Sequence, residues 1–465
     1  MELKSDRRTH TDTLVSAASL GHLPHLSNGL RAGASRVVVT PPLGRPLAGY
    51  PQRTKSSDSI HDDLHLRTLV FEIGGTRSAI LSLDVMAVDA QWVAELRLRV
   101  SRELGISPDN LLVAATHTHS GHGEILQFDG HLGHALAALF EQSEGPFDPV
   151  SYEYLLRQAA TGVKLAVERL VPAHIRIGSD SLDGVASNRV DPTRPVEGKC
   201  VAVSVDAVSG GPISTILHFT CHPSVLGDGD AGVSSDFPGV ACAIVESAVG
   251  GVALYLNGAL GDISTRFTRR GHAYSEAIRL GRMVGGTVLR ALGRAEPTTD
   301  VGITAMRTVI HLPTKGARWV VGASDREKQL TEELRHAEES GQPHGRIRQL
   351  KTALQGAQIA VALGPRLSSL PYVPVEVQLL RIGADLDLVA YPAELFSGLS
   401  AQLSVAVPDR TVLSVCPANG YLGYIPTADA FSASGYEADT CIVDCGAGES
   451  LVAGVIDRFY THRTT

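Results

Sequence analysis

The hydrophobic pattern predicts a strand–helix–strand unit near the N-terminus. Residues 66–85 form two apolar runs separated by Gly74-Gly75, a spacing typical of a β-hairpin. In residues 89–105, apolar positions recur at helical spacing, and Gly105 is placed to end the helix. The apolar run that begins at Asn110 then predicts a buried strand. The carboxyl end of such a strand is where open α/β sheets place their ligands.

Apolar and charged segments continue to alternate along the rest of the chain. Residues 325–362 are charged and helix-favouring, with a break at Gly341–Pro343, and predict a solvated surface helical hairpin rather than a partner-binding arm. The other expected elements are strands at 200–207, 213–222 and 251–262, a helix at about 239–249, a hairpin turning at Gly383-Ala384, and a closing helix at about 449–460. Strands that alternate with helices predict an α/β fold, a mixed β-sheet core flanked by helices. Without an internal repeat or a Pro/Ser-rich linker, we expect a tail at residues 1–29 and one continuous domain at 30–465.

Composition and charge narrow the class of protein. Hydrophobic residues make up 43% of the chain and charged residues 19%, values that are ordinary for a soluble globular enzyme. The formal charge of -8 is mild and no basic run stands out, so nucleic-acid binding is not expected. We expect a small-molecule substrate, and the sequence is compatible with a homo-oligomer.

The N-terminus and the cysteines indicate the cellular compartment in which we expect the protein. Arg7-Arg8 resembles the start of a twin-arginine signal, but no sufficiently apolar core follows it. No run reaches the ~18 apolar residues that span a bilayer. The six cysteines include no C-x-x-C motif, which fits reduced thiols. We therefore expect a cytoplasmic protein without a transmembrane segment.

Polar residues follow several apolar strands. His117 and His119 leave the strand in the sequence LLVAATHTHSGHGE, and alternation in an extended chain would direct both imidazoles to one side. An isolated H-x-H pair is a metal site about as often as it is a polar strand end. His222 ends another strand. His218 lies inside that strand, and we expect it either in the core or next to the metal ligands without binding the metal itself. Glu394 follows an apolar strand and Pro392, where a helix is expected to begin, and such a carboxylate usually serves the helix dipole.

A glycine-rich loop at 419–440 carries Tyr421, Tyr424 and Tyr436, which by themselves suggest packing or hydrogen-bond anchors. Together with the strand exits, this loop completes an ordered set of motifs. The motifs are ATHTHSG (115–121), CHPS (221–224), NGALGDIS (257–264), YPAE (391–394) and GYIPTADAFSASGYE (423–437), joined by AGY (48–50), SIHDDLHLRTLVF (59–71), SLDVMAV (82–88), SNR (187–189) and SSDFPG (234–239). In order and spacing, from about residue 30 to the C-terminus, this set resembles the neutral, non-lysosomal ceramidases.

The resemblance implies a ceramidase-like catalytic domain with one catalytic Zn²⁺. Carried over position by position, the implied ligands are His117, His222, Glu394 and Tyr424. Two imidazoles and a carboxylate with an open position are also what a hydrolytic zinc site requires.

The same resemblance implies roles for three further side chains. His119 would act as a general acid/base beside the metal-bound water and protonate the leaving amine. Tyr436 would hydrogen-bond the developing oxyanion, and Arg189 would reach into the same pocket. The implied reaction is hydrolysis of the carbon–nitrogen bond of an N-acyl amide or a ceramide-like substrate by metal-activated water.

Several alternatives stay open. The same site could cleave an ester or lactone, or the chain could be a non-catalytic metal-binding homologue. His122 stands where the family has a proline after T-H-T-H-S-G, Glu124 follows it, and the next loop is this chain's own. The resemblance therefore carries over the chemistry better than the substrate. A serine hydrolase built on Ser264 is disfavoured, because the G-x-S-x-G elbow is missing. Asp84 is expected either to orient a ligand histidine or to cap a helix.

Overall fold

The computed structural model describes residues 29–50, 53–126, 145–298, 302–433 and 435–461. The predicted tail at 1–29 lies outside these residues except for its last position, and the loop at 127–144 lies outside them as well. Among the described residues, no helix is both long and apolar enough to cross a membrane.

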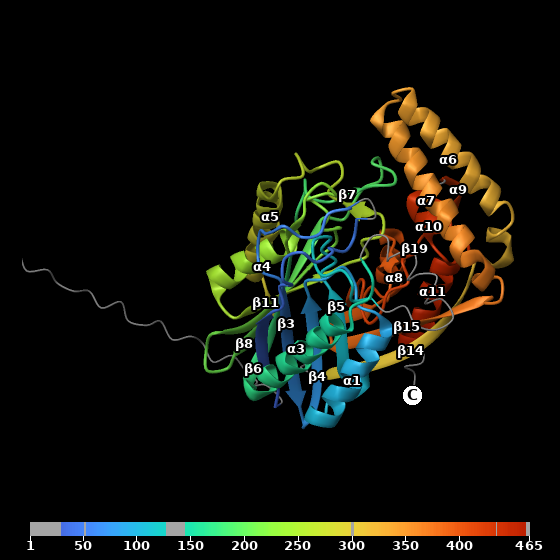
Figure 1. Cartoon of the computed structure of the whole chain (residues 1–465). Helices are drawn as coiled ribbons and strands as arrows, with labels where there is room; N and C mark the ends of the chain where they lie inside the picture. The colour runs from blue at the N-terminus through green and yellow to red at the C-terminus, as the bar shows by residue number, and fades with distance from the viewer. Residues whose placement is uncertain (1–28, 51–52, 127–144, 299–301, 434, 462–465) are drawn as a thin grey trace, which may run out of the picture.

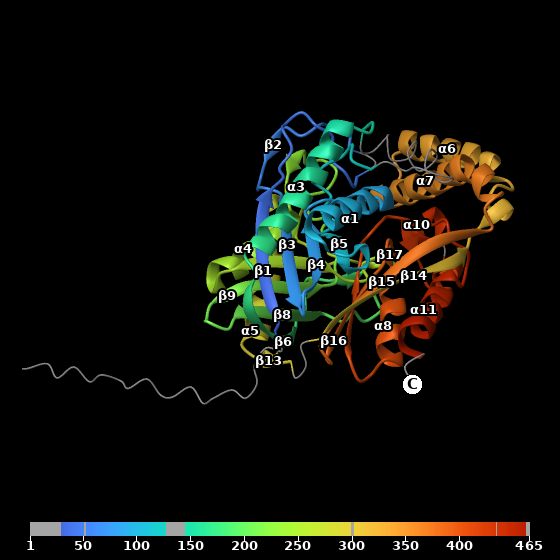
Figure 2. The ribbon, with the colours of Figure 1, turned by 90° about the horizontal axis from the view of Figure 1, so that it is seen from below.

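Three groups of strands form the centre of the molecule (Figures 1 and 2). The first holds β1 (Arg31–Val38), β3 (His65–Ile73), β4 (Thr76–Leu83) and β5 (Leu111–Ala115). The second holds β6 (Val171–Ser181), β8 (Lys199–Ala207), β9 (Pro212–Phe219) and β11 (Val252–Asn257), with β13 (Glu296–Pro297) beside β6. The third holds β14 (Ile303–Pro313), β15 (Tyr372–Ile382), β16 (Leu386–Ala390) and β18 (Thr411–Val415).

The first two groups are one mixed sheet that folds back on itself. β1 and β6 join them through only two residue pairs, Arg31 with Pro172 and Ala32 with Val171. β11, at the far edge, packs against β3, β4 and β5. A shared apolar cluster lies between the layers and includes side chains from all three strand groups, for example Phe71, Ile216 and Leu388. Burial of this apolar surface supplies the main driving force for closing the layers.

Helices cover the outer faces of the layers. Figure 1 shows α1 (Ala90–Leu104) and α3 (Pro149–Glu168) over the first strand group. α4 (Asp236–Val249) and α5 (Tyr274–Leu292) share an apolar cluster with β8, β9 and β11. α8 (Ser397–Ala406) and α11 (Ala447–Ile456) pack on the third group. This mixed sheet with flanking helices confirms the expected fold class.

The remaining elements are short or project from this body. α6 (Ala323–Glu339) and α7 (His344–Leu367) form a hairpin that extends from it in Figure 1. The short pairs are β2 (Ser59–Ile60) with β10 (Gly232–Val233), β7 (Ser187–Asn188) with β12 (Ile263–Ser264), and β17 (Glu394–Leu395) with β19 (Tyr424–Ile425). The other helical segments are α9 (Ala430–Ala433), α10 (Tyr436–Thr440), the 3₁₀ turns η1 (Pro108–Asn110) and η2 (Gly316–Trp319), and the π turn η3 (Asp457–Thr461).

Local sequence signals account for many boundaries. Gly74 and Gly75 have positive φ angles of 56° and 80° in the β3–β4 turn, which confirms the predicted hairpin. Gly105 ends α1 with a left-handed φ of 68°, as predicted. α4 starts at Asp236 rather than at the predicted Gly239. Pro238 is accommodated there because the first helical turn does not need its backbone N–H groups.

Candidate metal centre

Three of the expected site residues follow strands of the three different groups. His117 follows β5, His222 follows β9, and Glu394 follows β16. β5 runs parallel to β4, β9 to β11 and β16 to β18, so each exit is the carboxyl end of a parallel pair. Segments far apart in sequence thus converge at the edge where α/β proteins place ligands.

His117 is held by both its backbone and its ring. Its N–H donates to the carbonyl of Val85 at 3.0 Å, and its Nδ1–H donates to the carbonyl of Met86 at 2.8 Å. This pairing turns Nε2 toward His119 and Glu394. His117 has a φ of 68°, an uncommon value for a non-glycine residue and one found at functional sites.

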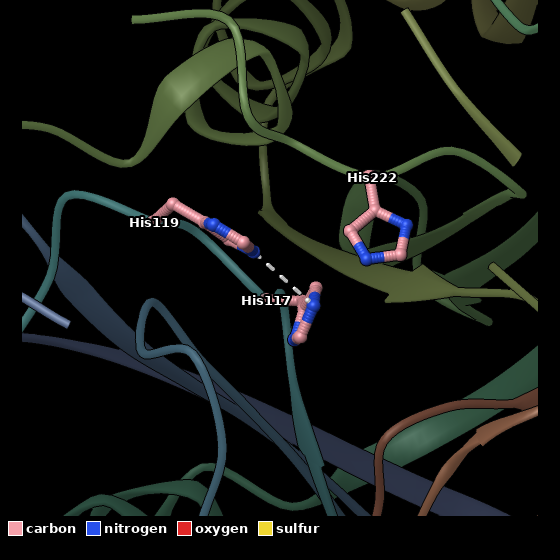
Figure 3. Close-up of side chains that lie close together, drawn as sticks. All are labelled: His117, His119 and His222. Atoms are coloured by element: carbon pink, nitrogen blue, oxygen red, sulfur yellow. Dashed lines mark hydrogen bonds between the residues drawn. The ribbon is translucent and has the colours of Figure 1, made fainter. Parts of the chain in front are cut away.

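This conformation corrects the strand-alternation argument. β5 ends at Ala115, so neither His117 nor His119 lies in an extended strand. The left-handed turn at His117 nevertheless brings the two rings together, with their Nε2 atoms 3.3 Å apart (Figure 3). The histidines converge as expected, but a turn is the cause.

The segment around Tyr50 holds His119 in place. The Tyr50 ring meets the imidazole edge to face at 5.0 Å, and Arg53 Nη1 donates to the His119 carbonyl at 2.9 Å. A side chain on Gly49 would collide with the imidazole, because an added Cβ would lie 2.5 Å from its Cγ. His119 Nδ1 is buried without a hydrogen-bond partner among the described residues.

His222 is fixed in the same manner as His117. Its Nδ1–H faces the carbonyls of Leu260 at 2.7 Å and Ile263 at 3.0 Å. Its Nε2 lies 2.7 Å from Oε2 of Glu394, and that oxygen is 3.6 Å from Nε2 of His117. Two imidazole nitrogens and a carboxylate oxygen therefore face one small volume.

Glu394 is not in a first helical turn, contrary to the expectation from its sequence position. It lies in β17, where it pairs directly with Tyr424 of β19, and its N–H donates to the Gly423 carbonyl at 2.9 Å. The carboxylate is 2% exposed, and its Oε1 accepts a hydrogen bond from the Tyr421 hydroxyl at 2.6 Å. The loop signal thus identified Tyr421 as an anchor, but it did not reveal that the partner is Glu394.

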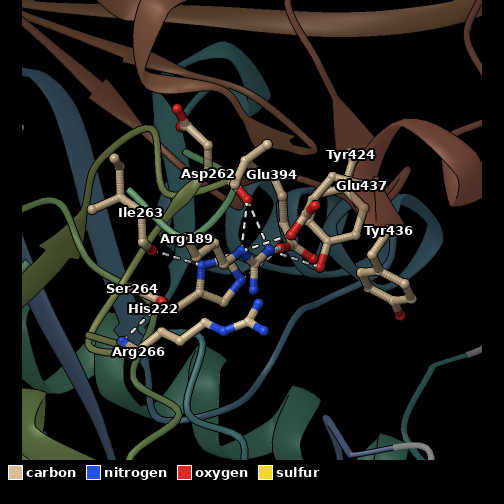
Figure 4. A network of polar contacts seen from close by, with 12 residues as sticks. Arg189, His222, Asp262, Ile263, Ser264, Arg266, Glu394, Tyr424, Tyr436 and Glu437 are labelled. Carbon is tan, nitrogen blue, oxygen red and sulfur yellow. Dashed lines mark hydrogen bonds and ion pairs between the residues drawn. The ribbon is translucent and has the colours of Figure 1, made fainter. Parts of the chain in front are cut away.

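Arg189 joins the cluster from the side of β7 (Figure 4). Its Nη2 donates to the Tyr424 hydroxyl at 3.1 Å and lies 3.8 Å from Oε2 of Glu394. Glu437, which sequence reasoning did not single out, pairs with Arg189 Nε at 2.9 Å. The arginine charge is therefore shared between two buried carboxylates.

Tyr436 stands beside Tyr424, with ring centroids 5.8 Å apart. The Gln355 side chain of α7 lies near its hydroxyl. In Figure 4 this hydroxyl is directed away from the Glu394 carboxylate. Tyr436 thus lies close to the cluster, and its role in binding the oxyanion stays a prediction.

Burial and charge set the protonation states. Burial lowers the pKa of His222 to about 4, so its imidazole is neutral above that pH. Burial, followed by the neighbouring His117 and His222, holds the pKa of His119 well below its usual value. Burial alone would raise the pKa of Glu394, but His117 and His222 hold it well below its usual range. His222 with a neutral imidazole and Glu394 with an ionised carboxylate are in the forms that bind a cation.

Three other candidate residues, Asp84, His218 and Ser264, make structural hydrogen bonds instead of belonging to the cluster. Asp84 neither orients a histidine nor caps a helix. Its Oδ2 accepts from Arg67 at 2.7 Å and from the His65 N–H at 2.8 Å, while Asp89 caps α1. His218 is a core histidine whose Nε2 bonds to the Ser414 carbonyl, and the Ser264 hydroxyl accepts from the Arg266 N–H as a turn residue does.

The donor set fits a metal ion. Among the described residues, His117, His119 and His222 offer ligand nitrogens that all lie within 4.8 Å of one another. The Nδ1–H groups of His117 and His222 are both directed to backbone carbonyls, the arrangement that fixes metal-binding histidines. The chain therefore has an α/β fold with a candidate metal site at its strand ends.

Comparison with known proteins identifies the family. A family model described as neutral/alkaline non-lysosomal ceramidase, N-terminal, matches residues 31–263. The structure of neutral ceramidase from Pseudomonas aeruginosa superimposes with a TM-score of 0.72 at 18% identity, over 92% of this chain and 74% of that chain. A ceramidase complexed with C2 matches with a TM-score of 0.70 at 17% identity, over the same shares of the chains. The chain belongs to the neutral/alkaline non-lysosomal ceramidase family, and this membership implies hydrolase activity.

Proposed function

We propose that the protein is a zinc-dependent amidohydrolase that cleaves an N-acyl amide or a ceramide-like substrate. The observation that carries the proposal is the meeting of His117 Nε2, His222 Nε2 and Glu394 Oε2 at the strand ends, with both Nδ1 atoms already occupied. Nitrogen and carboxylate donors of this kind suit Zn²⁺.

His117, His222, Glu394 and Tyr424 would hold the ion. Tyr424 pairs with Glu394 across the β17–β19 ladder, which puts the two backbones side by side. Burial, followed by the charge of Glu394, raises the pKa of Tyr424 well above its usual value, so without a cation the hydroxyl is protonated. A bound zinc ion would act as a Lewis acid that polarises the scissile carbonyl and makes water a stronger nucleophile.

The chain's own residues would do the remaining work. His119, neutral and with Nε2 turned toward His117, can take a proton from water and deliver it to the leaving amine. Arg189, which keeps its positive charge beside Tyr424, would stabilise negative charge on the carbonyl oxygen together with Tyr436. The buried walls of the cluster limit competing water and strengthen these electrostatic effects.

The amide assignment is tested by comparing one acyl chain in three substrates: an N-acyl amide, the matching ester and a lactone. The zinc-loaded protein should hydrolyse the amide, lose this activity on chelation, and regain it with zinc. His218→Gln, which alters a core histidine bonded to Ser414, should retain the activity and serves as the control. Ester or lactone turnover without amide turnover would favour the esterase or lactonase alternative. Amide turnover that resists chelation would contradict a role for the metal.

A further inference from the structure

Asn257, the last residue of β11, connects the chain segments that carry the two buried histidines. Its side-chain Nδ2 donates to the carbonyl of Thr116 at 3.2 Å and to that of Cys221 at 3.0 Å. Its Oδ1 accepts from the Cys221 N–H at 3.1 Å. Thr116 and Cys221 immediately precede His117 and His222 in the sequence.

The side chain is fully used by these contacts. A primary amide has two N–H donors and a carbonyl acceptor, and each finds a partner around Asn257, which is 0% exposed. The backbone of Asn257 adds a link to the third strand group, because its carbonyl accepts from the Cys416 N–H at 2.9 Å. One residue therefore ties together the ends of strands from all three layers.

The consequence concerns the distance between the two histidines. His117 and His222 belong to different strand groups, and their rings lie 4.8 Å apart. Because Asn257 bonds the residue before each of them, it sets how far apart the two main chains can move at the strand exits. A metal needs its ligands held at a fixed separation by groups that themselves do not touch it.

We propose that Asn257 is a positioning residue that sets the spacing of His117 and His222 for metal binding, an inference that rests on the proposed zinc site. It acts through the backbone and contacts neither the ion nor the substrate. Substitution of Asn257 should therefore weaken metal binding, whereas the loss of another buried hydrogen bond between the same strands should lower only the stability of the protein.

Ser82 offers a matched control. It is also fully buried, and its hydroxyl donates to the Tyr255 carbonyl at 2.6 Å, so it too links the first strand group to β11. Neither Ser82 nor Tyr255 adjoins a histidine of the cluster. Ser82→Ala thus removes a buried link between the same two layers without touching the residues that precede the histidines.

The experiment measures zinc affinity by competition with a chromophoric chelator, for the full-length wild type, Asn257→Ala, Asn257→Asp and Ser82→Ala. Asn257→Asp keeps the size of the side chain and the acceptor for the Cys221 N–H, so it reports on the lost donors if Asn257→Ala fails to fold. The absorption spectrum of the Co²⁺-substituted proteins gives a second readout of ligand geometry. The unfolding midpoint in chelator gives the stability of each metal-free protein.

Both Asn257 variants should bind zinc about 10–100-fold more weakly than the wild type, the usual effect of losing a group that orients ligands. Their Co²⁺ spectra should change, while Ser82→Ala should keep wild-type affinity and spectrum. Wild-type affinity in the Asn257 variants, or an equal loss in Ser82→Ala, would overturn the role of Asn257 alone. A wild type that binds no zinc would overturn the proposed site and this role with it.

Discussion

The Nε2 atom of His222 lies 2.7 Å from the Oε2 atom of Glu394, although 172 residues separate the two along the chain. The same oxygen is 3.6 Å from His117 Nε2, so the carboxylate faces both imidazoles at once. Each imidazole has its other nitrogen bonded to the backbone, which fixes the direction of the ring. Three buried ligand atoms held toward a common point are the physical basis of the proposed metal centre.

Tyr421 should support this centre by holding the carboxylate. Its hydroxyl donates to Glu394 Oε1 at 2.6 Å, which leaves Oε2 to face the histidines. Tyr421→Phe should therefore weaken zinc binding about 10–100-fold, as the loss of an outer hydrogen bond to a ligand usually does. Zinc competition titration measures the effect.

The matched control is Tyr152→Phe. The Tyr152 hydroxyl also donates to a glutamate carboxylate, that of Glu95 at 3.3 Å, but it lies on α3. This variant should bind zinc like the wild type. If Tyr421→Phe also does so, Tyr421 contributes packing only.

His119 should be separable from His117 by their effects on metal. If His119 is the acid/base, His119→Ala should keep zinc and lose roughly 10²–10⁴-fold in turnover, more for an amide than for an activated ester. His117→Ala should lose the metal. The assay pairs zinc analysis with the two turnover rates. Metal-free His119→Ala protein would instead make all three clustered histidines ligands, and unchanged amide turnover would remove His119 from the mechanism.

His218 should make the stability depend on pH. Burial lowers the pKa of His218 from 6.5 to about 4, so the folded protein binds its proton less readily than the unfolded chain. Compared with a variant that has an uncharged side chain at position 218, the wild type keeps its full stability above about pH 6.5. It loses stability relative to that variant as the pH falls toward 4.

The pH effect is read as a difference between two proteins, because other groups titrate in the same range. Between pH 7 and pH 4, the unfolding free energy of the wild type should fall relative to His218→Gln by about 3 kcal/mol at most. Chemical denaturation at several pH values gives this difference. A constant gap across the range would show that His218 titrates alike in both states.

Local patterns predicted the elements and their class. The Gly74-Gly75 turn, the Gly105 cap and the Gly383-Ala384 hairpin follow from the φ angles that glycine allows and from short-range apolar periodicity. The ordered motifs also led to His117 and His222, which the structure brings together with Glu394.

The contacts that hold the site could not be predicted in this way. Met86 and Leu260 bind the histidines through backbone carbonyls, which any residue type supplies, so the sequence carries no signal for them. The left-handed turn at His117 and the pairing of Glu394 with Tyr424 depend on how the three strand groups dock. Asn257 similarly gains its role only when those strand ends meet.

The presence of the proposed zinc centre is measured by metal analysis of the full-length protein purified without chelator. We expect about one zinc ion per chain in the wild type and in His218→Gln, and metal-free protein for His117→Ala, His222→Ala and Glu394→Ala. Wild-type protein that contains no transition metal, or a full zinc content in any of the three ligand variants, would contradict the proposed zinc centre.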